Sequence, residues 1–515
     1  MSQRNQLPAR ANVGQLKKQA KELLAELRAG SREAANRMRE VLPQARGLLA
    51  EAQLVIAREY GFASWSKLRQ RVEAIDLSDP LTAFTEAACV PLDGSGHASA
   101  GSERADAILA AHPAIARQDL VVAALLGDDE MVRQFVAADP EAATRTTGLY
   151  DWDPLTYLCF SRYLGRGGDQ FVRAARILLQ HGARADTGFY WQDHQPSPSF
   201  ESVLYGAAAV ARHLELTRLL LEHGADPNDG ETAYHVPETY DNRVLELLVE
   251  SGRLAPNSLT TMLARKHDWH DYGAVAWLLL HGADPNALSA WGRRALHQAL
   301  ERDNKLRFVE LLLDHGADPR LTNAAAQSAI VTAARAGRAD VLDAFARRGF
   351  VQRREGVDAL LEACARADAA GARALVAADS GLMHAVESQA PGALADFSGA
   401  GNREGVALML DLGFDPALTT SRAGSLRDTP LHAAIWRARH ETAKLLIARG
   451  APLETLNGRG ETPLAYAVRA TLHSEWTRER STEIVEALLA AGADPSTVKL
   501  PTGWQPLDAL FSERT

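Results

Sequence analysis

Residues 428–452 read DTPLHAAIWRARHETAKLLIARGAP, a stretch that marks where two helices begin and where the second one ends. Thr429 and Pro430 are typical of a helix start, because a threonine side chain caps the first turn and proline fixes its backbone. The apolar run before Gly450 gives the second helix a stripe to bury, and Gly450 supplies the left-handed backbone angle that ends it. The stretch therefore predicts two short helices joined by a turn.

An apolar run followed by glycine returns along most of the chain. Successive glycines lie from 28 residues apart (Gly224 to Gly252) to 42 residues apart (Gly182 to Gly224). The full set of predicted helix-ending glycines is Gly182, Gly224, Gly252, Gly282, Gly316, Gly349, Gly381, Gly413, Gly450 and Gly492. Two short helices cannot bury their apolar faces alone, so neighbouring copies must stack.

The spacing and the helix openings together point to one repeat family. The intervals centre near the roughly 33 residues of the ankyrin unit, and ETPLAYAV (461–468) and RALHQAL (294–300) share the TPLH-like opening of residues 429–432. The chain from about residue 119 to residue 515 resembles ankyrin-repeat proteins. That resemblance implies an all-α solenoid of about 11 helix pairs, several of them irregular, with a concave face built from the first helices and from projecting loops, or fingers.

A different segment precedes the array. We predict that residues 1–78 form a small basic helical head domain and that residues 79–104 form a helix and a Gly/Ser-rich linker. Residues 105–515 are predicted to form the array with a C-terminal cap. The string AQLVIAREYGFASWSKL (52–68) resembles a head segment found at the front of bacterial ankyrin-repeat proteins. Frequent Arg and Ala agree with a GC-rich bacterial genome.

Composition narrows the classes of protein that remain. The sequence has no apolar run long enough for a membrane span and no recognisable secretory signal, so we expect a cytoplasmic protein and leave export by a non-Sec route open. Cys89, Cys159 and Cys364 are far apart and are expected to be small buried hydrophobes. Residues 1–75 hold 14 Lys+Arg and 7 Asp+Glu, which gives them a net charge of +7, whereas the remainder of the chain has a net charge of −16. This uneven distribution of charge predicts electrostatic steering of partners.

The regular pattern breaks at TGFYWQDHQPSPSFES (187–202), an enlarged finger. Finger tips need no aromatic residue to fold, whereas rigid aromatic side chains anchor many protein interfaces. Two arrangements stay open: the aromatic residues line a binding groove, or they fold back over the solenoid. The predicted partner-binding residues are Tyr150, Asp151, Trp152, Asp153, Tyr190, Trp191, Asp193, His194 and Trp291.

KHDWHDYG (266–273) suggests a metal site, since two histidines and two aspartates lie within five residues. Counting back from Gly282 places His270 in the turn between two helices, where ligands from other elements are not expected to converge. We therefore predict no metal there. His297 and His432 are expected to bind the next loop through a structural hydrogen bond.

The sequence contains no GxSxG, HExxH, P-loop or dinucleotide-binding motif, so we expect no catalytic residues and no cofactor. We predict a monomeric protein-binding scaffold whose acidic, aromatic-lined groove receives another protein, with a basic segment as one suitable partner. The alternative is that the basic head binds nucleic acid or an acidic partner while the array recruits something else. The head lacks a nucleic-acid-binding motif, which disfavours nucleic acid.

Overall fold

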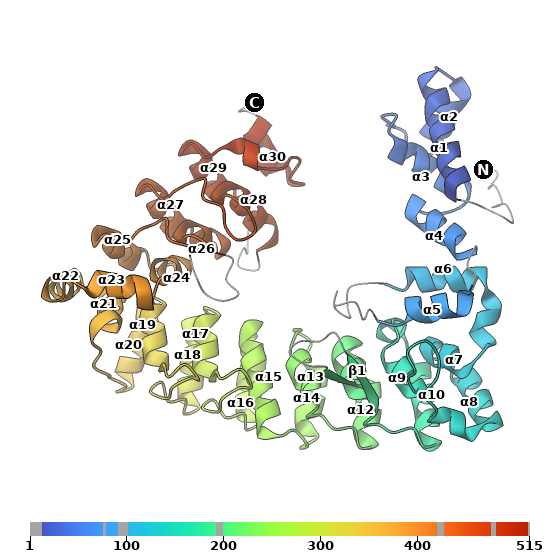
Figure 1. Ribbon diagram of the computed structural model, residues 1–515, viewed down its shortest axis with the longest axis horizontal. Helices are drawn as coiled ribbons and strands as arrows, with labels where there is room; N and C mark the ends of the chain where they lie inside the picture. Colours follow the sequence, from blue (N-terminus) through green and yellow to red (C-terminus); the bar gives the residue numbers. More distant parts are fainter. Residues whose placement is uncertain are drawn as a thin grey trace. The chain divides into compact units, whose positions relative to one another are not determined.

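The computed structural model of the protein describes residues 13–75, 79–90, 101–191, 199–419, 427–474 and 480–512. As predicted, the fold is an all-α repeat solenoid: the described residues form thirty α-helices and one sheet of two strands (Figure 1). The chain divides into two compact units, residues 1–262 and residues 263–515. Among the described helices, none combines the length and the apolar character that a membrane crossing requires.

The head has a hydrophobic core of its own within the first unit. Leu16, Leu23, Met38, Ile56 and Leu68 are buried together, with residues from all four of the first helices. Arg37 also pairs with Glu59, their Nε and Oε1 atoms 2.9 Å apart, which ties the second helix to the third. These helices are α1 (Val13–Arg28), α2 (Arg32–Val41), α3 (Leu49–Glu59) and α4 (Trp65–Ile75).

The remainder of the first unit begins with two helices and continues as helix pairs. The helices α5 (Pro80–Ala88) and α6 (Glu103–Ala111) contact each other, and α5 also contacts α7 of the first pair. The paired helices are α7 (Leu120–Leu126), α8 (Asp129–Ala138), α9 (Pro154–Cys159), α10 (Asp169–Gln180), α11 (Val203–Tyr205), α12 (Leu214–Glu222), α13 (Glu231–His235) and α14 (Arg243–Glu250). Helix α11 continues into the π-helical segment η4 (Gly206–Val210).

The second unit carries the remaining pairs and two helices outside the pairing. The unit boundary falls within α15 (Pro256–Asp268). The helices that follow are α16 (Tyr272–Leu280), α17 (Ala295–Glu301), α18 (Leu306–Asp314), α19 (Ala329–Arg335), α20 (Ala339–Arg347), α21 (Gly356–Ala365), α22 (Ala369–Ala378), α23 (Leu382–Gln389), α24 (Ala393–Ala400), α25 (Arg403–Asp411), α26 (Pro430–Trp436), α27 (His440–Ala448), α28 (Pro463–His473), α29 (Glu483–Ala490) and α30 (Gln505–Ser512). Short 3-10 segments are η1 (Pro113–Arg117), η2 (Pro140–Ala143), η3 (Leu164–Arg166) and η5 (Pro495–Thr497).

In the described ranges, eleven helix pairs run from α7–α8 to α28–α29, in agreement with the predicted number. Helix α23 is an additional helix between two pairs, and α30 is a single helix after the last pair. First helices of several consecutive pairs contact one another, as α17 does α19 and α26 does α28. Within each unit, buried apolar residues of neighbouring pairs that contact one another therefore pack together.

The helix starts behave as the sequence predicted. The Thr429 hydroxyl accepts a hydrogen bond from the His432 backbone N–H at 3.3 Å, and Pro430 occupies the first turn of α26. Thr462 caps α28 in the same way through the Ala465 N–H at 3.3 Å. His432 also reaches the carbonyl oxygen of Glu461 with its Nε2, 3.1 Å away, which confirms its predicted bond to the next loop.

The helix ends agree with the prediction at all but one of the proposed glycines. Gly450 has φ 79° and Gly492 has φ 95°, and the other predicted glycines except Gly381 also have positive φ. Gly381 was predicted wrongly: α22 ends at Ala378, and Gly381 has φ −87° at the start of α23. The additional helix α23 requires a helix start at this position, so no left-handed turn is needed.

The residue before several of these glycines is a histidine with a local structural role. His181, His223, His281 and His315 each bring Nδ1 to within 2.8–2.9 Å of the carbonyl oxygen four residues earlier. Carbonyl groups in the last turn of a helix have no partner within the helix. Each of these carbonyl oxygens also accepts the backbone N–H of the same histidine, so the ring adds a second hydrogen bond at the helix end. The three cysteines are free and buried, as expected.

Candidate functional site

The finger before α9 contains four of the predicted site residues, and the structure uses one of its carboxylates internally. Asp153 is 8% exposed and caps α9 by accepting hydrogen bonds from the Thr156 N–H at 3.1 Å and the Thr156 hydroxyl at 2.7 Å. It also accepts a hydrogen bond from the Thr187 hydroxyl at 2.7 Å. Asp153 therefore ties this finger to the next one. Asp151 is exposed in the same finger, with φ 54°.

Trp152 follows the second of the two arrangements left open by the sequence. It is only 7% exposed, and its ring stacks on Phe189 at 4.2 Å between ring centroids. Tyr157 lies 5.2 Å away on the same measure. Tyr150 is half-buried with its ring centroid 4.8 Å from that of Trp152. Trp152 thus belongs to the interior, because two adjacent fingers close over it, and it offers little surface to a partner.

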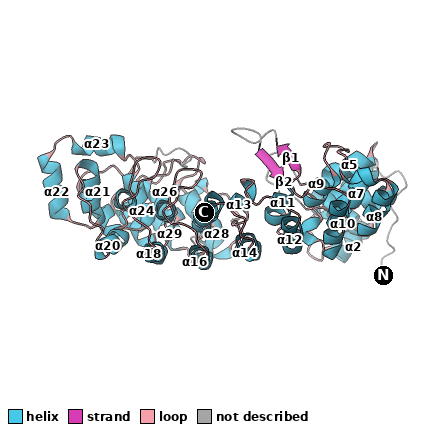
Figure 2. Cartoon of the chain, turned by 90° about the horizontal axis from the view of Figure 1, so that it is seen from below, coloured by secondary structure: helices cyan, strands magenta, loops and turns pink. Residues whose placement is uncertain are grey.

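The enlarged finger is a β-hairpin (Figure 2). Strand β1 (Gly188–Trp191) pairs antiparallel with β2 (Ser199–Ser202), with Tyr190 opposite Phe200. Tyr190 is 63% exposed, and its ring centroid lies 5.1 Å from that of Phe200. Because successive strand residues point to opposite faces, Phe189 points to the Trp152 side and Tyr190 to the other. Trp191 is half-buried at the end of β1, and the predicted residues Asp193 and His194 lie outside the described residues.

Carboxylates contact both ends of strand β2. Ser199 donates a hydrogen bond to Glu231 at 2.6 Å, and Ser202 donates one to Asp229. His235 bridges Glu231 and Glu238 at 3.3 Å and 3.0 Å. Burial alone would lower the pKa of His235, but its hydrogen bonds to the two glutamates outweigh burial and raise it to about 9. Burial also raises the pKa of Asp229 above its ordinary value.

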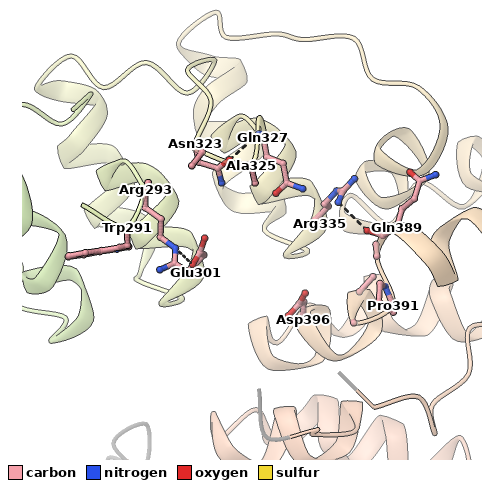
Figure 3. Close-up of a pocket in the computed structure, with 15 residues that line it drawn as sticks. Trp291, Arg293, Glu301, Asn323, Ala325, Gln327, Arg335, Gln389, Pro391 and Asp396 are labelled. Atoms are coloured by element: carbon pink, nitrogen blue, oxygen red, sulfur yellow. Dashed lines mark hydrogen bonds and ion pairs between the residues drawn. The ribbon is translucent and has the colours of Figure 1, made fainter. Parts of the chain in front are cut away.

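A pocket of about 650 Å³ in the second unit is lined on one side by Trp291, the remaining predicted site residue (Figure 3). Its walls are the finger 291–293, the finger 323–327, Arg335 of α19, and the turn between α23 and α24 with Asp396. Trp291 is half-buried and donates a long hydrogen bond of 3.5 Å from Nε1 to the Gln298 side chain. The pocket therefore combines one aromatic wall with polar groups from several repeats.

The basic side chains of the pocket are held by neighbouring acids. Arg293 pairs with Glu301, with 2.7 Å between Nε and Oε2. Arg335 pairs with Asp358 at 2.6 Å and donates from Nη1 to the carbonyl oxygen of Gln389 at 3.3 Å. These contacts fix the orientation of both guanidinium groups at the pocket wall.

The residues of KHDWHDYG make structural contacts within their own repeat and with the next one. His267 Nδ1 lies 2.7 Å from the Asn304 side-chain oxygen, and Lys266 pairs with Asp271 at 3.0 Å. Asp268 accepts a hydrogen bond from Arg302 at 2.7 Å. His270 has φ 51° in the turn between α15 and α16, as the sequence predicted. In the ranges that the structure describes, no group of three or more His, Cys, Asp or Glu side chains is arranged to hold a metal ion.

Comparison with known proteins agrees with this architecture. A family model described as ankyrin repeats in three copies matches residues 261–350 and 393–499, and a model of the single ankyrin repeat matches residues 201–232. The chain contains ankyrin repeats. It is 51% identical over 47 residues to the human Ankyrin repeat and SOCS box protein 18. That match covers 9% of this chain and 10% of the human protein, so the chain spans only a small part of that protein's length.

The ankyrin models leave residues 351–392 unmatched between their two matched ranges, and this segment includes α21 to α23. The Gln389–Gly392 wall of the Trp291 pocket comes from this unmatched segment. Sequence reasoning missed this wall, because residues 381–413 lack the TPLH-like opening and gave no sign of an additional helix. It also missed the pairing of Tyr190 with Phe200, which depends on the hairpin register.

Proposed function

We propose that this protein is a non-catalytic scaffold that binds another protein, with the hairpin finger as one contact surface. Ankyrin repeats generally serve protein–protein contacts, and a preformed repeat surface loses little conformational entropy on binding. The observation that carries the proposal is the Tyr190–Phe200 pair on the outer face of the hairpin, where Tyr190 is 63% exposed. Aromatic side chains of this kind commonly anchor interfaces.

The charge beside the hairpin favours a basic partner segment. Glu201, Asp229, Glu231 and Glu238 surround Tyr205 closely enough that their charges, added to burial, raise the pKa of its phenol. His235 balances part of this charge. Glu231 and Glu238 are partly exposed, whereas Glu201 is buried. Exposed carboxylates attract a basic segment and speed the encounter, and salt weakens this attraction. Asp151 adds an exposed carboxylate in the preceding finger.

The test is affinity capture from a lysate of the source organism, followed by mass spectrometry. The full chain is compared with the double variant Tyr190→Ser/Phe200→Ser and with the control Tyr240→Ser, since Tyr240 is 67% exposed but lies outside the hairpin. We expect at least one protein to be retained by the wild type and the control and lost from the double variant. Its retention should fall as salt rises from 0.05 to about 0.3 M.

Retention of the same proteins by all three baits would remove the hairpin as the contact surface. Retention of no specific protein would remove the scaffold proposal, and the basic head would then be tested for nucleic-acid binding. Circular dichroism of each bait checks that the substitutions leave the fold intact.

A further inference from the structure

The pocket around Trp291 has features that the repeat architecture does not require. Two of its walls are fingers of repeats matched by the ankyrin models, whereas the turn after α23 belongs to the unmatched segment 351–392. Helix α23 brings Gln389 and Pro391 opposite Trp291 and Gln327 (Figure 3). The pocket is therefore a property of this chain rather than of ankyrin repeats in general.

Both basic groups of this pocket already have acidic partners. Two basic residues, Arg293 and Arg335, and two acidic residues, Glu301 and Asp396, line it. Arg293 is paired with Glu301, and Arg335 is paired with Asp358 outside the pocket lining. A charged ligand would have to give up water and would meet guanidinium groups that already have carboxylate partners. The charge pattern thus favours an uncharged ligand.

Three side-chain amides face the same space. Within the described residues, the side-chain amides of Gln327 and Gln389 make no hydrogen bond. The side-chain oxygen of Asn323 accepts a hydrogen bond from the backbone N–H of Gln327 at 3.0 Å, but its NH₂ group makes none to the described residues. Each such amide offers one carbonyl acceptor and two N–H donors. That pattern is complementary to a peptide group, which offers one donor and one acceptor. Trp291 and Pro391 supply apolar surface beside the amides.

We propose that this pocket binds an uncharged, extended peptide segment of a partner protein through its main chain. Gln327 and Gln389 each pair with one peptide group of the segment, and Trp291 packs on one of its side chains. An extended segment leaves its N–H and C=O groups free for such pairing, whereas a helix uses them internally. This inference rests on the proposed scaffold function and adds a second contact surface with a chemistry different from that of the acidic hairpin.

The experiment is selection of phage-displayed random dodecapeptides on the immobilised full chain, followed by titration of the synthetic peptides. Binding is measured for the wild type, Gln327→Ala, Gln389→Ala, and the control Gln505→Ala, an exposed glutamine at the start of α30. We expect each pocket variant to weaken Kd about fivefold, the effect of one hydrogen bond, and the control to leave Kd unchanged. Methylation of one central peptide nitrogen should weaken binding by a similar factor.

Three outcomes would overturn the inference. These are no enrichment of any peptide, equal affinity for the wild type and both pocket variants, and a requirement for charged residues at the centre of the selected peptides. The hairpin variant Tyr190→Ser/Phe200→Ser is titrated in parallel. Peptides that depend on Tyr190 and Phe200 but not on Gln327 or Gln389 would support the scaffold and reject the pocket.

Discussion

At the scale of single residues, a side chain's role was predictable where it depends on its nearest neighbours in sequence. His432 was expected to bond to the next loop and does so. The burial of Trp152 was not predictable, because exposed and packed aromatic residues look alike in sequence. Its position depends on Phe189, which lies in a different finger and stacks on it at 4.2 Å. Its assignment as an exposed contact residue is therefore not supported by its 7% exposure.

His432 should make the stability of the protein depend on pH in the acid range. Burial lowers the pKa of His432 to about 4, because the charged ring would lose its hydration, and the hydrogen bond to the Glu461 carbonyl offsets only part of this effect. In the unfolded chain the pKa is about 6.5. The contribution of the neutral ring is therefore fully present above pH 6.5, falls as the pH drops, and reaches its minimum near pH 4.

The measurement is the free energy of unfolding in urea at pH 7 and pH 5, for the wild type and for His432→Gln. His432 alone should cost the wild type about 2 kcal/mol between these two pH values, and the variant should lose that much less. At pH 7 the variant should be the less stable protein, because the two hydrogen bonds of the ring are altered. Parallel changes with pH in both proteins would contradict the assignment.

At the scale of elements, the helix pairs were predictable because short sequence motifs mark where each helix starts and ends. Thr429 and Gly450 each act within a turn or two of the chain. The hairpin and α23 were not predictable in the same way. Strand pairing depends on the register between β1 and β2, and α23 replaces a finger without any cap signal in the sequence other than Gly381. Both unpredicted elements form surfaces that we propose as binding sites.

Gly188 should be needed for the hairpin to form. A Cβ atom at this position would lie 2.2 Å from the carbonyl oxygen of Glu201 and 2.9 Å from the Cα of Ser202, both backbone atoms. We expect Gly188→Ala to separate β1 from β2 and to speed amide hydrogen exchange in both strands at least about tenfold. The control is Gly165→Ala, where the nearest atom lies 3.8 Å away. Unchanged exchange in the hairpin of Gly188→Ala would show that the strands can shift to accept a methyl group.

At the scale of the whole molecule, the repeat number followed from the sequence, but contacts between distant repeats did not. Asp303 lies in the turn between α17 and α18 and bonds to Arg338 of the next pair at 3.1 Å. It also bonds to Arg439, 136 residues away in the turn between α26 and α27, and Arg437 lies 3.8 Å from it. No local motif marks this meeting, because it depends on how five consecutive pairs of the second unit stack.

Asp303 should therefore hold distant repeats of the second unit together. Asp303→Asn keeps the side-chain size and tolerates the left-handed angle of φ 50°, but it leaves Arg338, Arg437 and Arg439 without their shared carboxylate. Since Asp303 is only 6% exposed, we expect a loss of about 3 kcal/mol in the free energy of unfolding. The control Asp314→Asn removes the partner of Arg348, in an ion pair whose aspartate is 62% exposed, and should lower the free energy of unfolding by less than about 1 kcal/mol.

Hydrogen exchange locates the effect. Amides of α17 and α26 should open together in the wild type and the control, and separately in Asp303→Asn. Equal losses in the two variants, with α17 and α26 still opening together, would mean that helix packing alone joins these repeats.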